Sequence, residues 1–219
     1  MIKAVLFDLD GTLCNSLGDI AAATNYALSK QGYATHETDA FKYFVGDGIP
    51  KMLERALPEG HKTEDDVKKT NEIFAPYYKE HSSDLTVKYE GVTELLNELK
   101  KRGFKIAVCT NKAEPMAKIV VESLYGDVFD EIFGQREGIP TKPDPTLAKL
   151  LMKELGVEPE ECVFLGDSGV DVKTAVNSGA VAVGELWGYR EIEELNENGA
   201  EFIIEKPLEL LNLIDALNA

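Results

Sequence analysis

From Phe104 onward, short runs of apolar residues alternate with amphipathic helical patterns. The runs are apolar at consecutive positions, which is typical of parallel strands that are covered on both faces. Together with the N-terminal run, the chain contains about six such segments, at 3–8, 104–110, 131–134, 162–167, 180–184 and 201–204. This alternation predicts an α/β fold with a doubly wound parallel sheet as its Rossmann-like core.

The helices between these strands are marked by start and stop residues. Apolar residues recur at helical spacing within 92–102, and Gly103 suits the end of that helix. Pro115 suits the first turn of another helix. Asp144 is expected to cap a third helix, with Pro145 at its first position. Each of these helices lies between two predicted strands, as a doubly wound sheet requires.

Residues 14–87 have a different texture, because they hold no convincing strand. They contain three helical stripes of apolar residues, at 20–28, 41–45 and 49–56. We therefore expect an all-α subdomain inserted directly after the first strand. The α/β core then consists of residues 1–13 and 88–219.

A fourth helix in the insert has a clear beginning. Thr63 with Asp66 three residues later is a capping signature. Pro76, further along the same pattern, predicts a kink or an early end.

Charge and cysteine usage limit the possible partners and compartments. The net charge of −16 argues against nucleic acid and anionic membranes as partners. No apolar run approaches the ~20 residues of a membrane span, and the N-terminus is a poor secretory signal. The three cysteines, Cys14, Cys109 and Cys162, have no metal-ligand spacing, which favours reduced thiols in the cytoplasm. The sequence does not predict the oligomeric state.

Polar residues stand where the predicted strands end. In an open parallel sheet, ligands bind beyond the carboxyl ends of the strands. Four segments bring side chains to that edge: the two acids of "DLDGT", the end of "VCTN", the lysine of "PTKPDP" and the two acids of "GDSGVD". The residues are Asp8, Asp10, Thr110, Asn111, Lys142, Asp167 and Asp171.

This set of side chains suits phosphoryl transfer. Carboxylates and backbone carbonyls are the hard oxygen ligands that Mg²⁺ prefers. One carboxylate can attack phosphorus, and a second acid can protonate the departing oxygen. Lys142, Thr110 and Asn111 can hold the phosphoryl oxygens while negative charge builds. An anionic substrate needs such local cations, because the chain as a whole is acidic.

The four motifs "DLDGT", "VCTN", Lys142-Pro143 and "GDSGVD" resemble, in order and spacing, those of the haloacid dehalogenase-like hydrolase superfamily. The resemblance extends over nearly the whole chain. The helical insert 14–87 is similar to the small α-helical cap of that superfamily. The longer stretches "DGTLCNSLGDI", "VGDGIP" and "KPDP" are most similar to the phosphoglycolate phosphatase-like branch.

The resemblance implies a role for each acid. Asp8 is expected to be the nucleophile that becomes an aspartyl phosphate. Asp10 is expected to be the general acid and then the base that activates water. Mg²⁺ is expected to be held by Asp8, the backbone carbonyl of Asp10 and Asp167. Asp171 is expected to support the site from behind these ligands or through water.

The same resemblance implies that Thr110 and Lys142 bind the phosphate and that Gly11 allows the tight turn after the nucleophile. One departure from the family pattern is visible. Relatives commonly have Asp-Ser where this chain has Asn15 and Ser16. This position lies at the expected hinge of the cap and leaves the catalytic assignment unchanged.

The leading prediction is a Mg²⁺-dependent phosphatase that acts on a small phosphomonoester, with phosphoglycolate as the family-level candidate. A β-phosphoglucomutase-type phosphomutase and a pyrophosphatase remain alternatives, because both can share the aspartyl-phosphate chemistry. A mutase needs a second phosphate site, for which Lys51 and Arg55 in the insert are candidates. A dehalogenase is disfavoured, because its chemistry does not use an acid at the position of Asp10. A non-catalytic binding protein is disfavoured, because no motif residue is missing.

Overall fold

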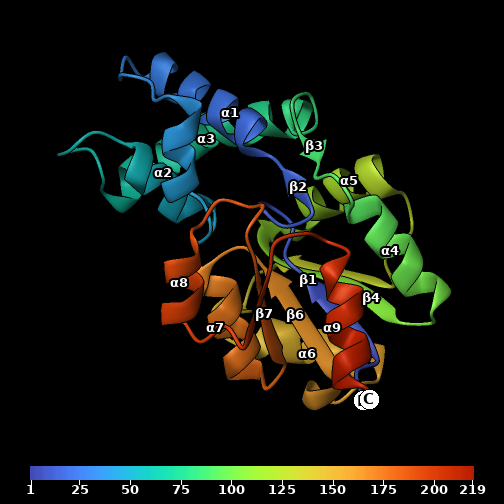
Figure 1. Cartoon of the computed structure of the whole chain (residues 1–219). Helices are drawn as coiled ribbons and strands as arrows, with labels where there is room; N and C mark the ends of the chain where they lie inside the picture. The colour runs from blue at the N-terminus through green and yellow to red at the C-terminus, as the bar shows by residue number, and fades with distance from the viewer. The chain divides into compact units, whose positions relative to one another are not determined.

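The computed structural model describes all residues, Met1–Ala219, and divides into two compact units (Figure 1). The first unit comprises Met1–Cys14 and Lys88–Ala219, and the second comprises Asn15–Val87. None of the helices combines the length and apolarity needed to cross a membrane. All three cysteines are free and buried.

A six-stranded sheet forms the centre of the first unit, and each pair of neighbouring strands is parallel. The strand order is β5-β4-β1-β6-β7-β8, so the order reverses at β1. The predicted α/β fold with a doubly wound parallel sheet is confirmed. The strands are β1 (Ala4–Phe7), β4 (Lys105–Ala113), β5 (Glu131–Gln135), β6 (Cys162–Gly166), β7 (Val181–Glu185) and β8 (Phe202–Ile204).

Helices cover both faces of this sheet (Figure 1). Alternate side chains of β1 enter two different apolar clusters, Val5 and Phe7 on one face and Ala4 and Leu6 on the other. The first face is covered by α4 (Val92–Lys101), α5 (Glu114–Tyr125) and α9 (Glu209–Leu217). The second face is covered by α6 (Thr146–Leu155), α7 (Gly169–Ser178) and α8 (Ile192–Glu197). A short 3-10 helix, η2 (Pro159–Glu161), precedes β6.

The start of α6 differs from the prediction by one position. The helix begins at Thr146, with Pro145 as its N-cap, so Asp144 is not the cap residue. Asp144 still accepts the first free N–H of the helix, because its Oδ1 lies 2.9 Å from the Thr146 nitrogen.

The second unit is helical, as expected. It contains α1 (Leu17–Lys30), the 3-10 helix η1 (Thr38–Tyr43), α2 (Ile49–Ala56) and α3 (Glu64–His81). The apolar stripe at 41–45 belongs to η1 and its end, and no α-helix forms there. Two short strands, β2 (Cys14–Asn15) and β3 (Val87–Lys88), pair where the chain passes between the units.

Helix α3 begins with the predicted capping box. The Thr63 hydroxyl accepts the Asp66 N–H, and the Asp66 carboxylate accepts the Thr63 N–H. Of the two outcomes predicted at Pro76, a kink or an early end, the early end does not occur, because the helix continues to His81. Phe74 and Tyr78 are buried on either side of the proline, so packing holds the helix together across it.

The two ends of the chain meet in the first unit. The Asn218 side chain follows α9 and accepts the N–H of Ile2, which precedes β1, through its Oδ1. The same amide donates to the Ile2 carbonyl oxygen at 3.4 Å. The first strand of the sheet is thus fastened to the last helix of the chain.

Candidate active site

The residues predicted from the strand ends meet at the carboxyl edge of the sheet. Asp8 directly follows β1, Asp167 directly follows β6, and Thr110 lies in the last part of β4. Lys142 comes from the loop before α6, and Asp171 lies in the first turn of α7. Asp8, Thr110, Lys142, Asp167 and Asp171 are all at most 8% exposed.

Lys142 is the centre of this group. Its Nζ donates to Asp8 Oδ1 at 2.7 Å and to Asp171 Oδ1 at 2.6 Å. The other Asp171 oxygen, Oδ2, accepts from the Ser168 hydroxyl at 2.6 Å and from the Ser168 N–H at 3.2 Å. Asp171 therefore belongs to the capping box of α7 and holds Lys142 at the same time; its supporting role stays a prediction.

Asp8, Asp167 and Asp171 form a compact acidic cluster. One carboxylate oxygen of each lies within 4.8 Å of the others, and all three residues are buried. Such a set of hard oxygen donors fits a divalent cation of the Mg²⁺ type. Both Asp171 oxygens accept protein hydrogen bonds, so Asp8 and Asp167 are the better placed ligands.

The pKa values reflect the crowding of negative charge. Burial raises the pKa of Asp8 to about 7; Asp171 adds to the rise and Lys142 opposes it. Burial, then the charges of Asp171 and Asp8, raises the pKa of Asp167 well above its usual value. Burial lowers the pKa of Lys142, but the two acids outweigh it and the net pKa is raised. A bound cation would relieve the repulsion among the acids.

Two glycines allow the backbone to approach Asp167 closely. Gly11 has a φ of +104°, and a Cβ there would lie 2.4 Å from Asp167 Oδ2. At Gly188, a Cβ would lie 2.3 Å from the Asp167 Cβ and 2.6 Å from the Gly11 carbonyl oxygen. The turn that follows Asp8 and Asp10 thus fits against Asp167 only because no side chain intervenes.

Asn111 has a task that the sequence did not indicate. Its Oδ1 accepts the Lys142 N–H at 2.7 Å, and its Nδ2 donates to the Lys142 carbonyl at 3.1 Å. The side chain therefore fixes the backbone of the lysine loop. The Thr110 Oγ1 accepts the Lys112 N–H at 3.2 Å. The Thr110 hydroxyl still has its own proton, which it can donate to another acceptor. The phosphate-binding roles of Asn111 and Thr110 stay predictions.

Lys112 was missed by the sequence analysis. Its Nζ donates to both carboxylate oxygens of Asp10, at 2.9 and 3.0 Å. The exposed fraction of the Lys112 side chain is 4%, and that of the Asp10 side chain is 18%. Its position directly after "TN" is the only signal that could have identified it.

Glu185, at the end of β7, is a second residue that was missed. It is fully buried, and burial followed by the charge of Asp167 raises its pKa well above the usual value. Its Oε2 accepts the N–H groups of Trp187 and Gly188 at 2.6 and 3.1 Å. Oε1 has no hydrogen-bond partner.

The turn that Glu185 organises contacts two parts of the site. The Trp187 indole donates to the Thr12 carbonyl at 3.0 Å, next to Gly11. The Tyr189 N–H donates to Asp167 Oδ2 at 2.9 Å. Residues 185–189 thus position both the loop after Asp8 and one predicted metal ligand, Asp167. Trp187 packs against the core in this turn.

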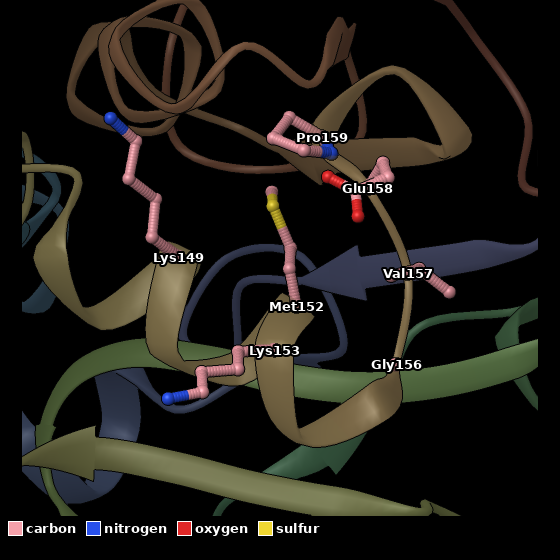
Figure 2. Close-up of a pocket in the computed structure, with 7 residues that line it drawn as sticks. All are labelled: Lys149, Met152, Lys153, Gly156, Val157, Glu158 and Pro159. Carbon is pink, nitrogen blue, oxygen red and sulfur yellow. The ribbon is translucent and has the colours of Figure 1, made fainter.

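A separate pocket of about 280 Å³ lies between the C-terminal half of α6 and η2 (Figure 2). Figure 2 shows the side chains of Lys149, Met152 and Lys153 on one wall and Glu158 and Pro159 on another. The pocket is next to the segment that leads into β6, at the amino end of that strand. It is therefore distinct from the carboxyl edge at which the acids gather.

Comparison with known proteins shows which proteins this chain is similar to. Residues 5–184 match a family described as haloacid dehalogenase-like hydrolase. The chain is 32% identical to a phosphoglycolate phosphatase of Aquifex aeolicus, covering 98% of this chain and 97% of that one. It is 31% identical to a phosphoglycolate phosphatase of Vibrio parahaemolyticus, covering 97% and 96%. A crystal structure of a candidate phosphoglycolate phosphatase from Lactobacillus delbrueckii is similar at a TM-score of 0.91 and 31% identity, covering 97% and 98%.

Proposed function

Because this chain belongs to the haloacid dehalogenase-like hydrolase family, we propose that it is a Mg²⁺-dependent phosphatase that hydrolyses a small phosphomonoester through an aspartyl phosphate on Asp8. Phosphoglycolate is the first candidate substrate, on the names of the relatives. The observation that carries the proposal is the meeting of Asp8, Asp167, Asp171 and Lys142 at one edge of the sheet.

In the first step, a carboxylate oxygen of Asp8 attacks phosphorus. The new O–P bond forms as the ester P–O bond breaks, and Asp10 gives its proton to the departing oxygen. Asp8, the Asp10 backbone carbonyl and Asp167 would hold a Mg²⁺ ion, which would supply positive charge where the two anions approach each other. Lys142 holds the carboxylate of Asp8 from the side that faces Asp171.

In the second step, water attacks the phosphorus of the aspartyl phosphate. The Asp10 carboxylate takes the proton of that water, inorganic phosphate departs and the Asp8 carboxylate is restored. Thr110 and Lys142 are the donors proposed to hold the phosphoryl oxygens in both steps. The turn 185–189 keeps Asp167 and the loop after Asp8 in place throughout.

Residues 14–87 are proposed to act as the cap that restricts which phosphomonoesters enter. Within that unit, Arg55 donates to the Phe44 carbonyl at 2.8 Å and pairs with Asp47, so it holds the loop before α2. Lys51 pairs with Glu54 at 2.7 Å. Both candidate cations for a second phosphate therefore have local partners, and no observation favours the mutase over the phosphatase.

The experiment uses purified full-length protein with 4-nitrophenyl phosphate and phosphoglycolate. We expect turnover in Mg²⁺, none in excess chelator, and a phosphorylated peptide containing Asp8 after rapid acid quenching. Asp8→Asn should remain folded and lose turnover, whereas Asp127→Asn, at an exposed aspartate of the same unit, should be unaffected. Near-normal rates for folded Asp8→Asn, or full activity in chelator, would refute the mechanism.

A further inference from the structure

The ion pair between Lys112 and Asp10 is not used by the mechanism proposed above. Lys112 lies in the last part of β4, two residues after Thr110, and it is almost fully buried. Its ammonium group contacts both oxygens of the acid that delivers the proton. Proton transfer by Asp10 does not itself require a cation on that carboxylate.

Burying an ammonium group is costly, so its placement calls for a function. A neutral amide or hydroxyl could orient Asp10 with a smaller desolvation penalty. The other buried ammonium of the site, on Lys142, is shared between Asp8 and Asp171. Lys112 therefore adds a separate positive charge, on the side of the site where the leaving group departs.

The position of Lys112 relative to the leaving group follows from the role of Asp10. A general acid must lie within ~2.6–3.2 Å of the oxygen that it protonates. Lys112 Nζ lies 2.9 and 3.0 Å from the Asp10 oxygens. The ammonium is therefore at most about 6 Å from the ester oxygen of a bound phosphomonoester, by adding that reach to the observed distances. A carboxylate separated from this oxygen by one methylene therefore comes within reach of the ammonium when it is turned toward Lys112.

We propose that Lys112 is a specificity-determining residue, which selects phosphomonoesters that carry a carboxylate on the carbon next to the ester oxygen. The proposal rests on the proposed function and names the substrate class of the same site. Before substrate binds, Asp10 balances the charge of Lys112. Once substrate is bound, its carboxylate shares the ammonium group with Asp10. A substrate with a neutral alkyl group cannot make this interaction.

The test compares phosphoglycolate with ethyl phosphate, in which a methyl group replaces the carboxylate. For each enzyme, the measured quantity is the ratio of kcat/KM on the two substrates. Lys112→Met should reduce this ratio by about 10- to 100-fold, the range typical of losing a hydrogen bond to a charged group. The loss should be mainly in KM for phosphoglycolate. Lys112→Arg, which keeps the charge, should retain most of the preference.

Lys118→Met is the matched control. Lys118 lies on α5, its side chain is 55% exposed, and it pairs with Glu114 at 2.9 Å. Its replacement should leave the ratio unchanged. Equal losses on both substrates in Lys112→Met would mean that Lys112 acts only through Asp10, and would overturn the proposal. An unchanged ratio in that variant would overturn it as well.

A measurement on the unmodified protein keeps the proposal testable even where Lys112→Met fails to fold. 3-Phosphonopropionate has the shape and charge of phosphoglycolate but cannot be hydrolysed, and propylphosphonate lacks its carboxylate. With 4-nitrophenyl phosphate as substrate, 3-phosphonopropionate should inhibit at least about 10-fold more strongly. Equal inhibition would refute the selection of a carboxylate. Absence of any phosphatase activity would instead refute the proposed function, so the two failures are distinguishable.

Discussion

Replacing Lys142 by methionine should lower the free energy of unfolding by about 3–5 kcal/mol at pH 8 in the absence of metal, the range seen when one partner of a buried ion pair is removed. The Lys142 side chain is 2% exposed, and it contacts Asp8 and Asp171 at 2.7 and 2.6 Å. Methionine fills a similar space without the charge. The substitution therefore leaves the buried carboxylates of Asp8 and Asp171 without the cation that they share, next to the third buried carboxylate, Asp167.

The size of this loss should depend on pH. The pKa of Asp8 is about 7 in the folded protein and 3.8 when unperturbed. Between pH 3.8 and about pH 7, Asp8 binds more protons in the folded state than in the unfolded state. The free energy of unfolding therefore falls as the pH rises through this interval. Lys142 lowers the pKa of Asp8, so its removal extends this interval to higher pH. The difference between the two proteins should therefore be smaller at pH 5, where Asp8 is largely protonated in both.

The assay is urea unfolding of the unmodified protein and of Lys142→Met, at pH 5 and pH 8, with and without excess Mg²⁺. Lys149→Met, at an exposed lysine of α6, is the control and should change little. Mg²⁺ should recover part of the loss at pH 8, because it binds the folded acidic cluster and replaces the missing charge. A loss of the same size at both pH values, unaffected by Mg²⁺, would contradict the electrostatic account.

The other predictions concern the proton donor, the metal and the packing around it. Asp10→Asn should slow turnover of an alkyl phosphate by ~10²–10⁴-fold and of an aryl phosphate by less, because a good leaving group needs less protonation; equal losses in the phosphorylation step would exclude the acid role. Ca²⁺ should inhibit, since it takes more oxygen ligands at longer distances and would engage both oxygens of Asp8; full turnover with Ca²⁺ alone would contradict this. Gly188→Ala should lower kcat/KM by ~10²-fold, the scale of a ~1 Å misplacement in a site, because its Cβ would lie 2.3 Å from the Asp167 Cβ. Gly103→Ala is the control: no atom lies within 4 Å of the added Cβ, so the strain of its φ of +82° should lower stability but leave kcat/KM unchanged, and equal effects of the two changes on kcat/KM would refute the packing argument.

The sheet could be predicted because each of its strands is a continuous apolar run bounded by polar residues. The strand ends then indicated which side chains would meet, since parallel strands present their carboxyl ends at one edge. Asp8, Lys142, Asp167 and Asp171 were found in this way and lie together in the structure. Their catalytic roles remain proposals.

Lys112 could not be found by the same reasoning, because the apolar run that defines β4 stops at Thr110. The strand continues to Ala113, and its register with β5 shifts between Cys109 and Ala113. The register shift changes which face of the sheet each side chain after Thr110 points toward. The periodicity of apolar residues in the sequence does not reveal such a shift. A lysine after the last apolar residue of a strand is ordinarily solvated, so only the structure shows this one to be buried.

Glu185 was missed for a related reason. A glutamate at the end of a strand is usually exposed, whereas this one is enclosed by the turn that it hydrogen-bonds. The course of α3 through Pro76 also depends on tertiary packing, through Phe74 and Tyr78, and the early end that local propensity allowed does not occur.

The central place of β1 in the sheet has a consequence for synthesis on the ribosome. This strand emerges before its partners β4 and β6, which begin only at Lys105 and Cys162, and its neighbour Ile2 is bound by Asn218. The nascent α/β unit therefore has an apolar first strand with no sheet to join until most of the chain has been translated. Pairings so distant in sequence form slowly, which leaves the emerging segment exposed to chaperones and to aggregation. A chain released before β6 is complete would lack Asp167 and Asp171, and the acidic cluster could not assemble.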